Sequence, residues 1–323
     1  MSREWTVGID FGGTTVKIGL VNRTGRVVST CPIPSREVRQ PRVFVERVGQ
    51  VVESFSRILG IRPAQLRGVG VGAPGPVDVE HGVVHALVNV SGWHRVPLQR
   101  LLERRLRCRC VVDNDVNLVA LGEWRLGAGQ GAEHLVCLTL GTGVGGGLMC
   151  HGRLHRGSSG AGGEIGHMTI NPQGPRCGCG SHGCLEAYIG TEAILRMGRA
   201  AIRKGAEPLR TLARQGDGSL TPKLIHQAAQ AGDLAAQHIW ERLGYYLGVG
   251  IASTINLLNP DRIVIGGGVA GAWASFAPTL RKTVRALAMP VSVRAARIVP
   301  ARLGNRAGIV GAAVLVWNEF ESR

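Results

Sequence analysis

The chain has 323 residues and a mass of 34.2 kDa, which is long enough for two lobes that each bury a core. Its hydrophobic content of 44% excludes a disordered protein, and the sequence has no run of about 18 apolar residues that would span a membrane. The net charge of +16 raises the question of a nucleic-acid partner. The basic residues are scattered and the densest run, Arg104–Arg109, has no interleaved aromatics, so we expect solvated charges and no nucleic-acid partner.

The first third of the chain reads as alternating strands and helices. Apolar residues at every second position predict strands around Trp5–Ile9 and Val16–Leu20, separated by a turn over Asp10–Thr15. Apolar residues at helical spacing predict a helix over residues 43–59. Further strands are expected at residues 69–71, near Val83 and at 110–113, followed by a helix over 116–126.

A second cycle begins at Leu135 with the same order of strand, Gly/Thr turn and strand. Apolar residues that step by four predict a long helix over 234–258, which should stop at Asn259-Pro260. A buried strand at 263–265 then leads into three glycines, and a closing helix is expected over 307–320. Residues 205–222 are rich in turn-forming residues and predict a mobile surface loop.

The start of the chain, MSREWTVGID, lacks the apolar core of a secretory signal, which predicts a cytoplasmic protein. In a reducing compartment, the eight cysteines favour a metal site or free thiols over disulfides.

The glycine-rich turns raise the possibility of nucleotide binding. No Walker A loop is present, and residues 141–146 match G-x-G-x-x-G without the helix that a dinucleotide fold needs directly afterwards. Hydride transfer is therefore disfavoured. Two matching hairpin turns offer backbone N–H groups and threonine hydroxyls to phosphate oxygens, while Asp10 could face a magnesium ion. Either turn alone could be an ordinary β-turn, but the two together, with Gly266–Gly268 after a buried strand, predict nucleotide binding.

His167 is followed by three cysteines in the pattern H-x9-C-x-C-x4-C, which ends at Cys184. Three thiolates and an imidazole are a ligand set that zinc prefers, and four protein ligands close its tetrahedral shell. Free thiols or a single disulfide are the alternatives. We predict a structural zinc site that stiffens the loop up to Glu186, with the ligands His167, Cys177, Cys179 and Cys184.

The run Val112–Asn117 carries acidic and amide groups between a predicted strand and a predicted helix. Asp115 there is a candidate general base for an alcohol, and Asn114 a candidate ligand for a neighbouring hydroxyl. Helix capping is the rival interpretation for Asp115, and we interpret Asp113 simply as a capping or turn residue. Glu164, His167 and Glu186 supply further polar groups suited to sugar hydroxyls.

Seven segments together resemble the ROK family of repressors, open reading frames and sugar kinases, and are most similar to the bacterial ATP-dependent glucokinases within it. They are GIDFGGTTVK, GAPGPVD, DNDVN, GTGVGGG, GAGGEIGH, CGCGSHGCLE and NPDRIVIGGG, in that order, and the resemblance as a whole runs from about Val7 to Ala313. The resemblance implies an α/β chain with the actin-like, hexokinase-type ATPase fold, with two lobes around a cleft. We expect residues 1–117 and 307–323 in the small lobe and residues 118–306, with the zinc loop, in the large lobe.

The resemblance also implies transfer of a phosphoryl group from ATP, with Mg²⁺, to the 6-hydroxyl of a hexose, and a place in glycolysis. Asp115 is then the catalytic base and also contacts the sugar, together with Asn114, Glu164, His167 and Glu186. The implied nucleotide-binding residues are Asp10, Gly12, Gly13, Thr14, Thr15, Gly141, Thr142, Gly143, Gly146, Gly267 and Gly268. The resemblance implies zinc on His167 and the three cysteines, and a homodimer or a dimer of dimers.

Several alternatives stay open at this stage. N-acetylmannosamine, N-acetylglucosamine or fructose could replace glucose, and polyphosphate could replace ATP. A sugar-responsive regulator is disfavoured, because only nine residues precede Asp10 and no DNA-binding segment is seen there.

Overall fold

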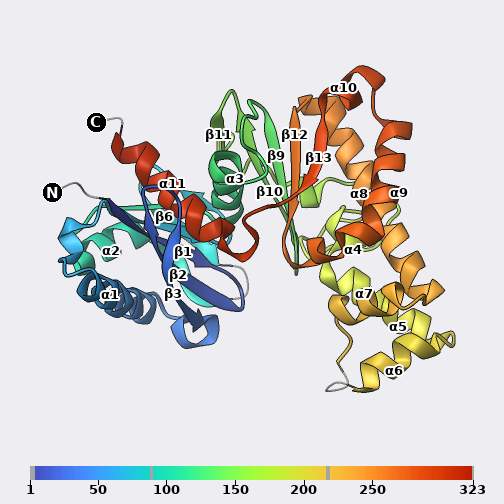
Figure 1. Cartoon of the computed structure of the whole chain (residues 1–323), viewed down its shortest axis with the longest axis horizontal. Coiled ribbons are helices and arrows are strands. Elements are labelled where there is room, and N and C mark those ends of the chain that lie inside the picture. The colour runs from blue at the N-terminus through green and yellow to red at the C-terminus, as the bar shows by residue number, and fades with distance from the viewer. Residues whose placement is uncertain (1–3, 88–89, 216–218, 322–323) are drawn as a thin grey trace. The chain divides into compact units, whose positions relative to one another are not determined.

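The computed structural model describes residues 4–87, 90–215 and 219–321 and shows a mixed α/β chain with two five-stranded sheets (Figure 1). The first sheet has the strand order β3-β2-β1-β4-β8. Strand β1 pairs with β2 in antiparallel and with β4 in parallel fashion, and β4 pairs in parallel with β8. The strands of this first sheet are β1 (Trp5–Phe11), β2 (Thr15–Asn22), β3 (Val27–Pro34), β4 (Gly68–Ala73) and β8 (Cys110–Asn114). The predicted strands at residues 5–9, 16–20, 69–71 and 110–113 are confirmed.

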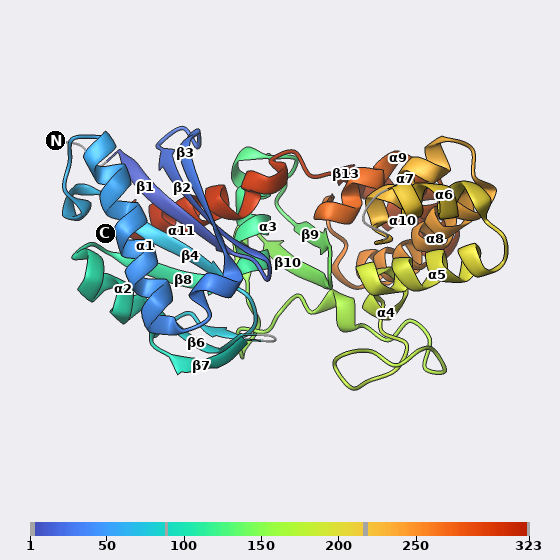
Figure 2. The same cartoon turned by 90° about the horizontal axis from the view of Figure 1, so that it is seen from below.

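Helices cover both faces of this sheet (Figure 2). Helices α1 (Pro41–Ile58) and α2 (Leu98–Leu106) lie on one face, where Phe44 and Val48 join the core formed by Val7, Ile9 and their neighbours. Helix α1 confirms the predicted helix and begins with Pro41, because the first helical turn needs no backbone N–H from that position. Helix α3 (Asp115–Leu126) packs against α11 (Ala307–Glu321), which lies against β1 and β4 on the other face. A separate three-stranded sheet lies between β4 and α2 in the sequence and consists of β5 (Val77–Asp78), β6 (Val83–Leu87) and β7 (Val90–Val96).

Helix α11 approaches the sheet so closely that only glycine fits beneath it. A Cβ atom on Gly8 of β1 would lie 2.0 Å from the carbonyl oxygen of Ile309, and one on Gly70 of β4 would lie 2.1 Å from that of Ala312. On the other side of the helix, a Cβ on Gly311 would lie 1.7 Å from the carbonyl oxygen of Leu118. The predicted closing helix is therefore confirmed as a tightly packed part of the first sheet's core.

The second sheet repeats the strand order of the first, as β11-β10-β9-β12-β13. Strand β12 pairs in parallel with both β9 and β13. Residues 144–150 form a strand, so the chain lacks the helix of a dinucleotide-binding turn, as predicted. The strands are β9 (Leu135–Leu140), β10 (Val144–Cys150), β11 (Arg153–His155), β12 (Arg262–Gly266) and β13 (Arg297–Pro300).

The long helix α8 (Leu234–Leu258) has the predicted bounds and packs against α9 (Trp273–Leu287). It ends at Asn259, whose φ of 44° is left-handed, directly before Pro260. Its apolar residues at steps of four, from Ile239 to Ile255, are buried. The other helices here are α4 (Glu186–Ile189), α5 (Thr191–Arg203), α6 (Glu207–Gln215), α7 (Pro222–Gln230) and α10 (Pro290–Ala295). Short 3₁₀ turns are η1 (Ser35–Val38), η2 (Pro63–Gln65), η3 (Ile165–His167), η4 (Gly268–Ala272) and η5 (Gly304–Arg306).

The prediction of a surface loop over 205–222 is wrong for most of its length, because residues 207–215 form helix α6 and Pro222 begins α7. Proline in the first turn of a helix costs no hydrogen bond, so Pro208 is compatible with α6. Leu209 is fully buried, and its backbone N–H donates to the carboxylate of Asp233 at 3.1 Å. Residues 216–218 of the predicted loop lie outside the described residues.

The chain divides into two compact units. The first comprises residues 1–131, 147–162 and 302–323, and the second comprises residues 132–146 and 163–301. The expected lobe boundary at residues 117 and 118 stays a prediction, because a packing unit and a moving lobe need not coincide. Within the described ranges, no helix combines the length and apolar character needed to cross a bilayer.

Candidate active site and metal centre

The predicted general base lies at the junction of β8 and α3 in the first unit. Asp115 is the first residue of α3, and the residue that caps this helix is Asn114, whose Oδ1 accepts from the backbone N–H groups of Val116 and Asn117 at 2.9 and 3.2 Å. The Nδ2 of Asn114 donates to the carbonyl oxygen of Gly75 at 3.2 Å. Asn114, and not Asp115, is therefore the capping residue, and Oδ1 of Asp115 also accepts from the backbone N–H of Val116 at 2.9 Å.

The interpretation of Asp113 as a capping or turn residue is also wrong. Asp113 lies in β8 with an exposed fraction of 0%, and its carboxylate accepts from the guanidinium of Arg156. A buried carboxylate needs such partners, because it has lost the hydration that stabilises its charge. Arg156 is 43 residues away in sequence and was not among the predicted site residues.

The first glycine turn joins β1 to β2 and is closed by its own backbone. The N–H of Gly12 donates to the carbonyl oxygen of Thr15 at 3.2 Å, and the Ser35 hydroxyl donates to that of Gly12 at 2.7 Å. Gly13 has open space where a Cβ would stand. The turn thus has the close, uncovered backbone that phosphate binding needs.

Asp10 lies beside this turn and pairs with Lys17 across the hairpin, with 3.2 Å between Oδ2 and Nζ. The two residues are cross-strand partners in the β1–β2 register, a relationship that counting along the hairpin would have revealed. Asp10 is also in register with Gly72 of β4, which is in register with Asp113 of β8. The sheet therefore brings Asp10 and the Asp113–Asp115 junction to the carboxyl ends of β1 and β8, the two parallel strands on either side of β4, where α/β proteins gather their sites.

The second glycine turn, in the second unit, is tied to the residue that follows the cysteines. The N–H of Gly141 donates to the carbonyl oxygen of Gly143 at 2.9 Å, and Thr191 donates to that of Gly141 through its hydroxyl at 2.7 Å. Glu186 accepts from the N–H of Val144 at 2.8 Å. A Cβ on Gly143 would lie 2.5 Å from the Glu186 carboxylate, so glycine is required for this approach.

Gly267, after β12, packs against the end of β9. Its φ is 86°, and an added Cβ would lie 2.2 Å from the carbonyl oxygen of Leu140. Both the backbone conformation and the space exclude a larger residue here. Gly268 is exposed, with open space where its Cβ would stand. The structure therefore places Gly267 against the last residue of β9, next to the second glycine turn.

The segment Glu164–His167 lies along β10. A Cβ on Gly146 would lie 2.3 Å from the carbonyl oxygen of Gly163, and one on Gly166 would lie 2.0 Å from that of Val144. The side chain of Glu164 is 64% exposed, with its Oε2 3.9 Å from Nε2 of His167. These contacts fix the backbone between the second glycine turn and His167, the predicted metal ligand.

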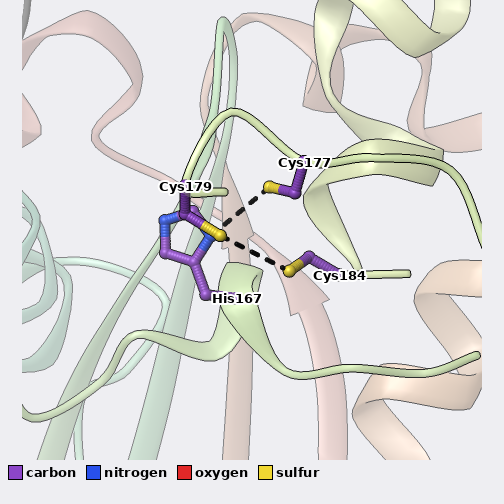
Figure 3. Close-up of side chains that lie close together, drawn as sticks. All are labelled: His167, Cys177, Cys179 and Cys184. Atoms are coloured by element: carbon purple, nitrogen blue, oxygen red, sulfur yellow. Dashed lines mark hydrogen bonds between the residues drawn. The ribbon is translucent and has the colours of Figure 1, made fainter. Parts of the chain in front are cut away.

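The four predicted zinc ligands converge on one point (Figure 3). Their ligand atoms all lie within 4.8 Å of one another; Nδ1 of His167 is 3.7 Å from Sγ of Cys177, and Sγ of Cys179 is 3.7 Å from Sγ of Cys184. A tetrahedron with zinc–sulfur bonds of about 2.3 Å has edges of about 3.8 Å. Because these two separations are close to this edge and the donors are those that zinc prefers, the residues fit a tetrahedral zinc ion.

The pKa values of the three cysteine thiols depend on their burial and on nearby hydrogen-bond donors. Burial raises the pKa of Cys177 to about 12 and also raises the pKa of Cys184, while the backbone N–H of Ser181 lowers the pKa of Cys179. Sγ of Cys177 also lies 3.8 Å from Oε1 of Glu186. Glu186 therefore stands between the cysteine cluster and the second glycine turn, and contacts both.

Each unit thus assembles part of the predicted site. The first unit gathers Asp10, the first glycine turn, Asn114 and Asp115, and the second gathers the second glycine turn, Gly267, Glu164, Glu186 and the predicted zinc ligands. Lys17 and Arg156 are charged neighbours of these residues that sequence reasoning missed.

Comparison with known proteins agrees with these motifs over the whole length. The family model described as ROK family matches residues 6–319. The chain is 37% identical to a glucokinase of Halalkalibacterium halodurans, over 100% of this chain and 98% of that protein. It is 35% identical to a glucokinase of Thermotoga maritima, over 96% of each.

A solved structure of a ROK family glucokinase from Streptomyces griseus, in complex with glucose and AMPPNP, superposes with a TM-score of 0.83 at 35% identity. The match covers 96% of this chain and 98% of that one. The predicted actin-like, hexokinase-type ATPase fold is confirmed. The motifs, the fold and the full-length match lead to one conclusion: this chain belongs to the ROK family.

Proposed function

We propose that this protein is a glucokinase, which transfers the γ-phosphoryl group of ATP to the 6-hydroxyl of glucose. The observation that carries the proposal is the full-length similarity to glucokinases, including one whose structure contains glucose and the ATP analogue AMPPNP. The rigid glycine turns and the carboxylate at a strand end are compatible with this chemistry, since phosphoryl transfer depends mainly on positioning and charge stabilisation.

Asp115 is the proposed general base. It takes the proton of the sugar 6-hydroxyl as the oxygen attacks the γ-phosphorus in line, late in a loose transition state. Asn114, Glu164, His167 and Glu186 are the proposed sugar ligands beside it. Since Oδ1 of Asn114 caps α3 and one Nδ2 proton is donated to Gly75, the second Nδ2 proton would be its contribution to a sugar.

The two glycine turns are the proposed phosphate sites, and Gly267-Gly268 the proposed neighbour of the adenosine. Their backbone N–H groups would stabilise negative charge on the phosphates. Asp10 would hold the Mg²⁺ of the nucleotide, directly or through water, and Lys17 offsets the charge of Asp10 in its absence. Magnesium bound there would neutralise part of the negative charge on the phosphates.

Zinc is the proposed occupant of the site formed by His167, Cys177, Cys179 and Cys184. Four protein ligands leave no open position, so its role is structural. It would fix the loop between Glu164 and Glu186. We further propose a cytoplasmic enzyme at the entry to glycolysis, acting as a homodimer or a dimer of dimers without a nucleic-acid partner.

The test is a panel of hexoses offered to the purified chain with ATP or with polyphosphate. ADP release is measured for the ATP reactions, and glucose 6-phosphate is measured with a coupled dehydrogenase for both donors. We expect glucose and ATP to give the highest kcat/KM. A higher kcat/KM with N-acetylmannosamine, N-acetylglucosamine or fructose would reassign the acceptor, a preference for polyphosphate would reassign the donor, and inactivity with every pair would refute the kinase.

A further inference from the structure

The buried carboxylate of Asp113 lies two residues before the proposed base and has no role in the function proposed above. It is fully buried in the last part of β8. Burying a carboxylate is costly unless hydrogen bonds satisfy its oxygens and an opposite charge lies close by. The hydrogen-bond partners of Asp113 therefore indicate which part of the structure depends on this buried charge.

Four donors surround the carboxylate, all in the first unit. Oδ2 accepts from Nε and Nη2 of Arg156 at 2.9 and 2.6 Å. Oδ1 accepts from the backbone N–H of Asn114 at 2.7 Å and from Nδ2 of Asn117 at 3.0 Å. Both oxygens are thus satisfied, and the arginine supplies the only positive charge among these donors.

These hydrogen bonds form a closed network around Asp115. Asn114 directly precedes Asp115, and its side chain accepts from the two backbone N–H groups that follow Asp115. The backbone N–H of Asn114 in turn donates to Asp113. Asn117 donates its backbone N–H to Asn114 and its side chain to Asp113. On the far side, a Cβ on Gly72 would lie 3.1 Å from Cα of Asp115, so the neighbouring strand backs the residue closely. The backbone of the proposed base is held from three directions.

Arg156 brings a second segment to this network. It directly follows β11, and its carbonyl oxygen accepts from the N–H of Gly162 at 2.7 Å, which closes residues 156–162 into a loop. Gly157 has a φ of 69°, as this tight loop requires. The side chain of Arg156 docks the loop on Asp113, with only 28% of the side chain exposed.

We propose that Arg156 is a positioning residue for the phosphoryl-transfer step: through the carboxylate of Asp113 it fixes the turn that aims Asp115 at the sugar hydroxyl. This inference rests on the proposed kinase function. Arginine suits the task because two of its N–H groups reach one oxygen in a fixed geometry, whereas lysine offers a point charge on a flexible stem. Displacing a reacting group by about 1 Å lowers the rate by up to about 100-fold, so loss of this arrangement should slow the reaction.

A purely structural ion pair predicts loss of stability without loss of turnover per folded molecule, and the two roles can be separated. We suggest Arg156→Met, Arg156→Lys, Asp113→Asn and the double variant Asp113→Asn/Arg156→Met. The matched control is Arg153→Met, an exposed arginine on β11 three residues away. kcat and KM for glucose and ATP are measured per folded molecule, well below the lowest thermal midpoint of the set.

We expect Arg156→Met to lower kcat by about 10- to 100-fold, with the KM for ATP within about twofold of the wild type. Arg156→Lys should recover part of the loss, and Arg153→Met should match the wild type. The double variant should be no slower than Arg156→Met, because the arginine acts through the carboxylate and the two losses then do not add.

Two results would overturn the inference while the wild type remains an active kinase. One is a kcat of Arg156→Met equal to that of Arg153→Met. The other is a double variant whose loss is the product of the single losses, since this would place Arg156 on a ligand independently of Asp113. If Arg156→Met does not fold, the same comparison between Arg156→Lys and Arg153→Lys decides. An inactive wild type would instead refute the kinase function, and the inference would fall with it.

Discussion

The carboxylate of Glu186 joins the cysteine cluster to the second glycine turn: one oxygen accepts from the N–H of Val144 at 2.8 Å, and the other lies 3.8 Å from Sγ of Cys177. From its residue type and the family resemblance, the sequence predicts Glu186 as a sugar ligand. The contact with Val144 gives it a second relationship, with the turn proposed to bind phosphate. A change at Glu186 should therefore affect the nucleotide as well as the sugar.

Replacing Glu186 by alanine tests this coupling. Loss of the acceptor frees the N–H of Val144 and loosens the turn at 141–143, so we expect Kd for AMPPNP to rise at least about 10-fold, together with KM for glucose. Calorimetry with AMPPNP in the absence of sugar measures the nucleotide effect directly. Glu192→Ala, at an exposed glutamate paired with Arg199, is the control. Unchanged nucleotide affinity in Glu186→Ala would confine Glu186 to the sugar.

The role of Asp115 is tested by Asp115→Ala. Removal of a general base typically lowers the rate by two to four orders of magnitude, so we expect kcat to fall at least about 100-fold. Glucose affinity, followed by tryptophan fluorescence, should change far less than kcat, because the other ligands remain. Glu80→Ala, at an exposed carboxylate, is the control. Turnover near that of the wild type would remove Asp115 from the proposed role.

From the proposed metal centre we expect about one zinc ion per chain in the purified protein. Elemental mass spectrometry measures this content. Cys179→Ser should lose this zinc, lower the thermal midpoint and raise KM for glucose, because the loop carrying Glu164 and Glu186 is no longer fixed. Cys31→Ser, at a cysteine outside the cluster, should retain the metal. A wild-type protein without zinc would contradict the assignment.

His226 predicts an acid-sensitive contribution to stability. It lies half-buried, with Nδ1 3.1 Å from the Ser275 hydroxyl, and burial lowers its pKa below the ordinary value of 6.5. The unfolded chain then binds the proton more readily, so the free energy of unfolding should fall as pH drops below about 6.5. Urea unfolding at pH 7.5 and 5.5 measures this loss. It should be smaller in His226→Asn than in the wild type, whereas the exposed His238→Asn should retain most of it.

The fold was predictable where local pattern decides structure. The bounds of α8 follow from apolar residues at steps of four and from the Asn259-Pro260 stop, and the paired hairpins follow from alternation around Gly/Thr turns. Helix α6 was missed because turn-forming residues on either side outweighed a short apolar repeat at Leu209 and Ala213. That repeat becomes decisive only when a core is present to bury it.

The candidate site was predictable in its residue types and not in its long-range pairs. The spacing of His167 and the cysteines predicts that these four side chains share one site, because zinc chemistry limits the possible donors, and the structure does bring them together. The pair Asp113–Arg156 spans 43 residues, and no local signal marks it. Local sequence therefore favours a turn residue at Asp113, and only the folded sheet and the following loop bring Arg156 to its carboxylate.

The close fit of α11 has a consequence for biosynthesis. The glycines of β1 and β4 are shaped to receive the backbone of Ile309 and Ala312, so the first unit lacks one layer of its core until residues 307–321 have left the ribosome. The second unit, whose segments end at Ala301, is fully translated before the first can close. The opening segment of the chain is thus among the last to acquire its native packing, and a nascent chain halted before Ile309 would leave the glycine-lined face of β1 and β4 open to chaperones and proteases.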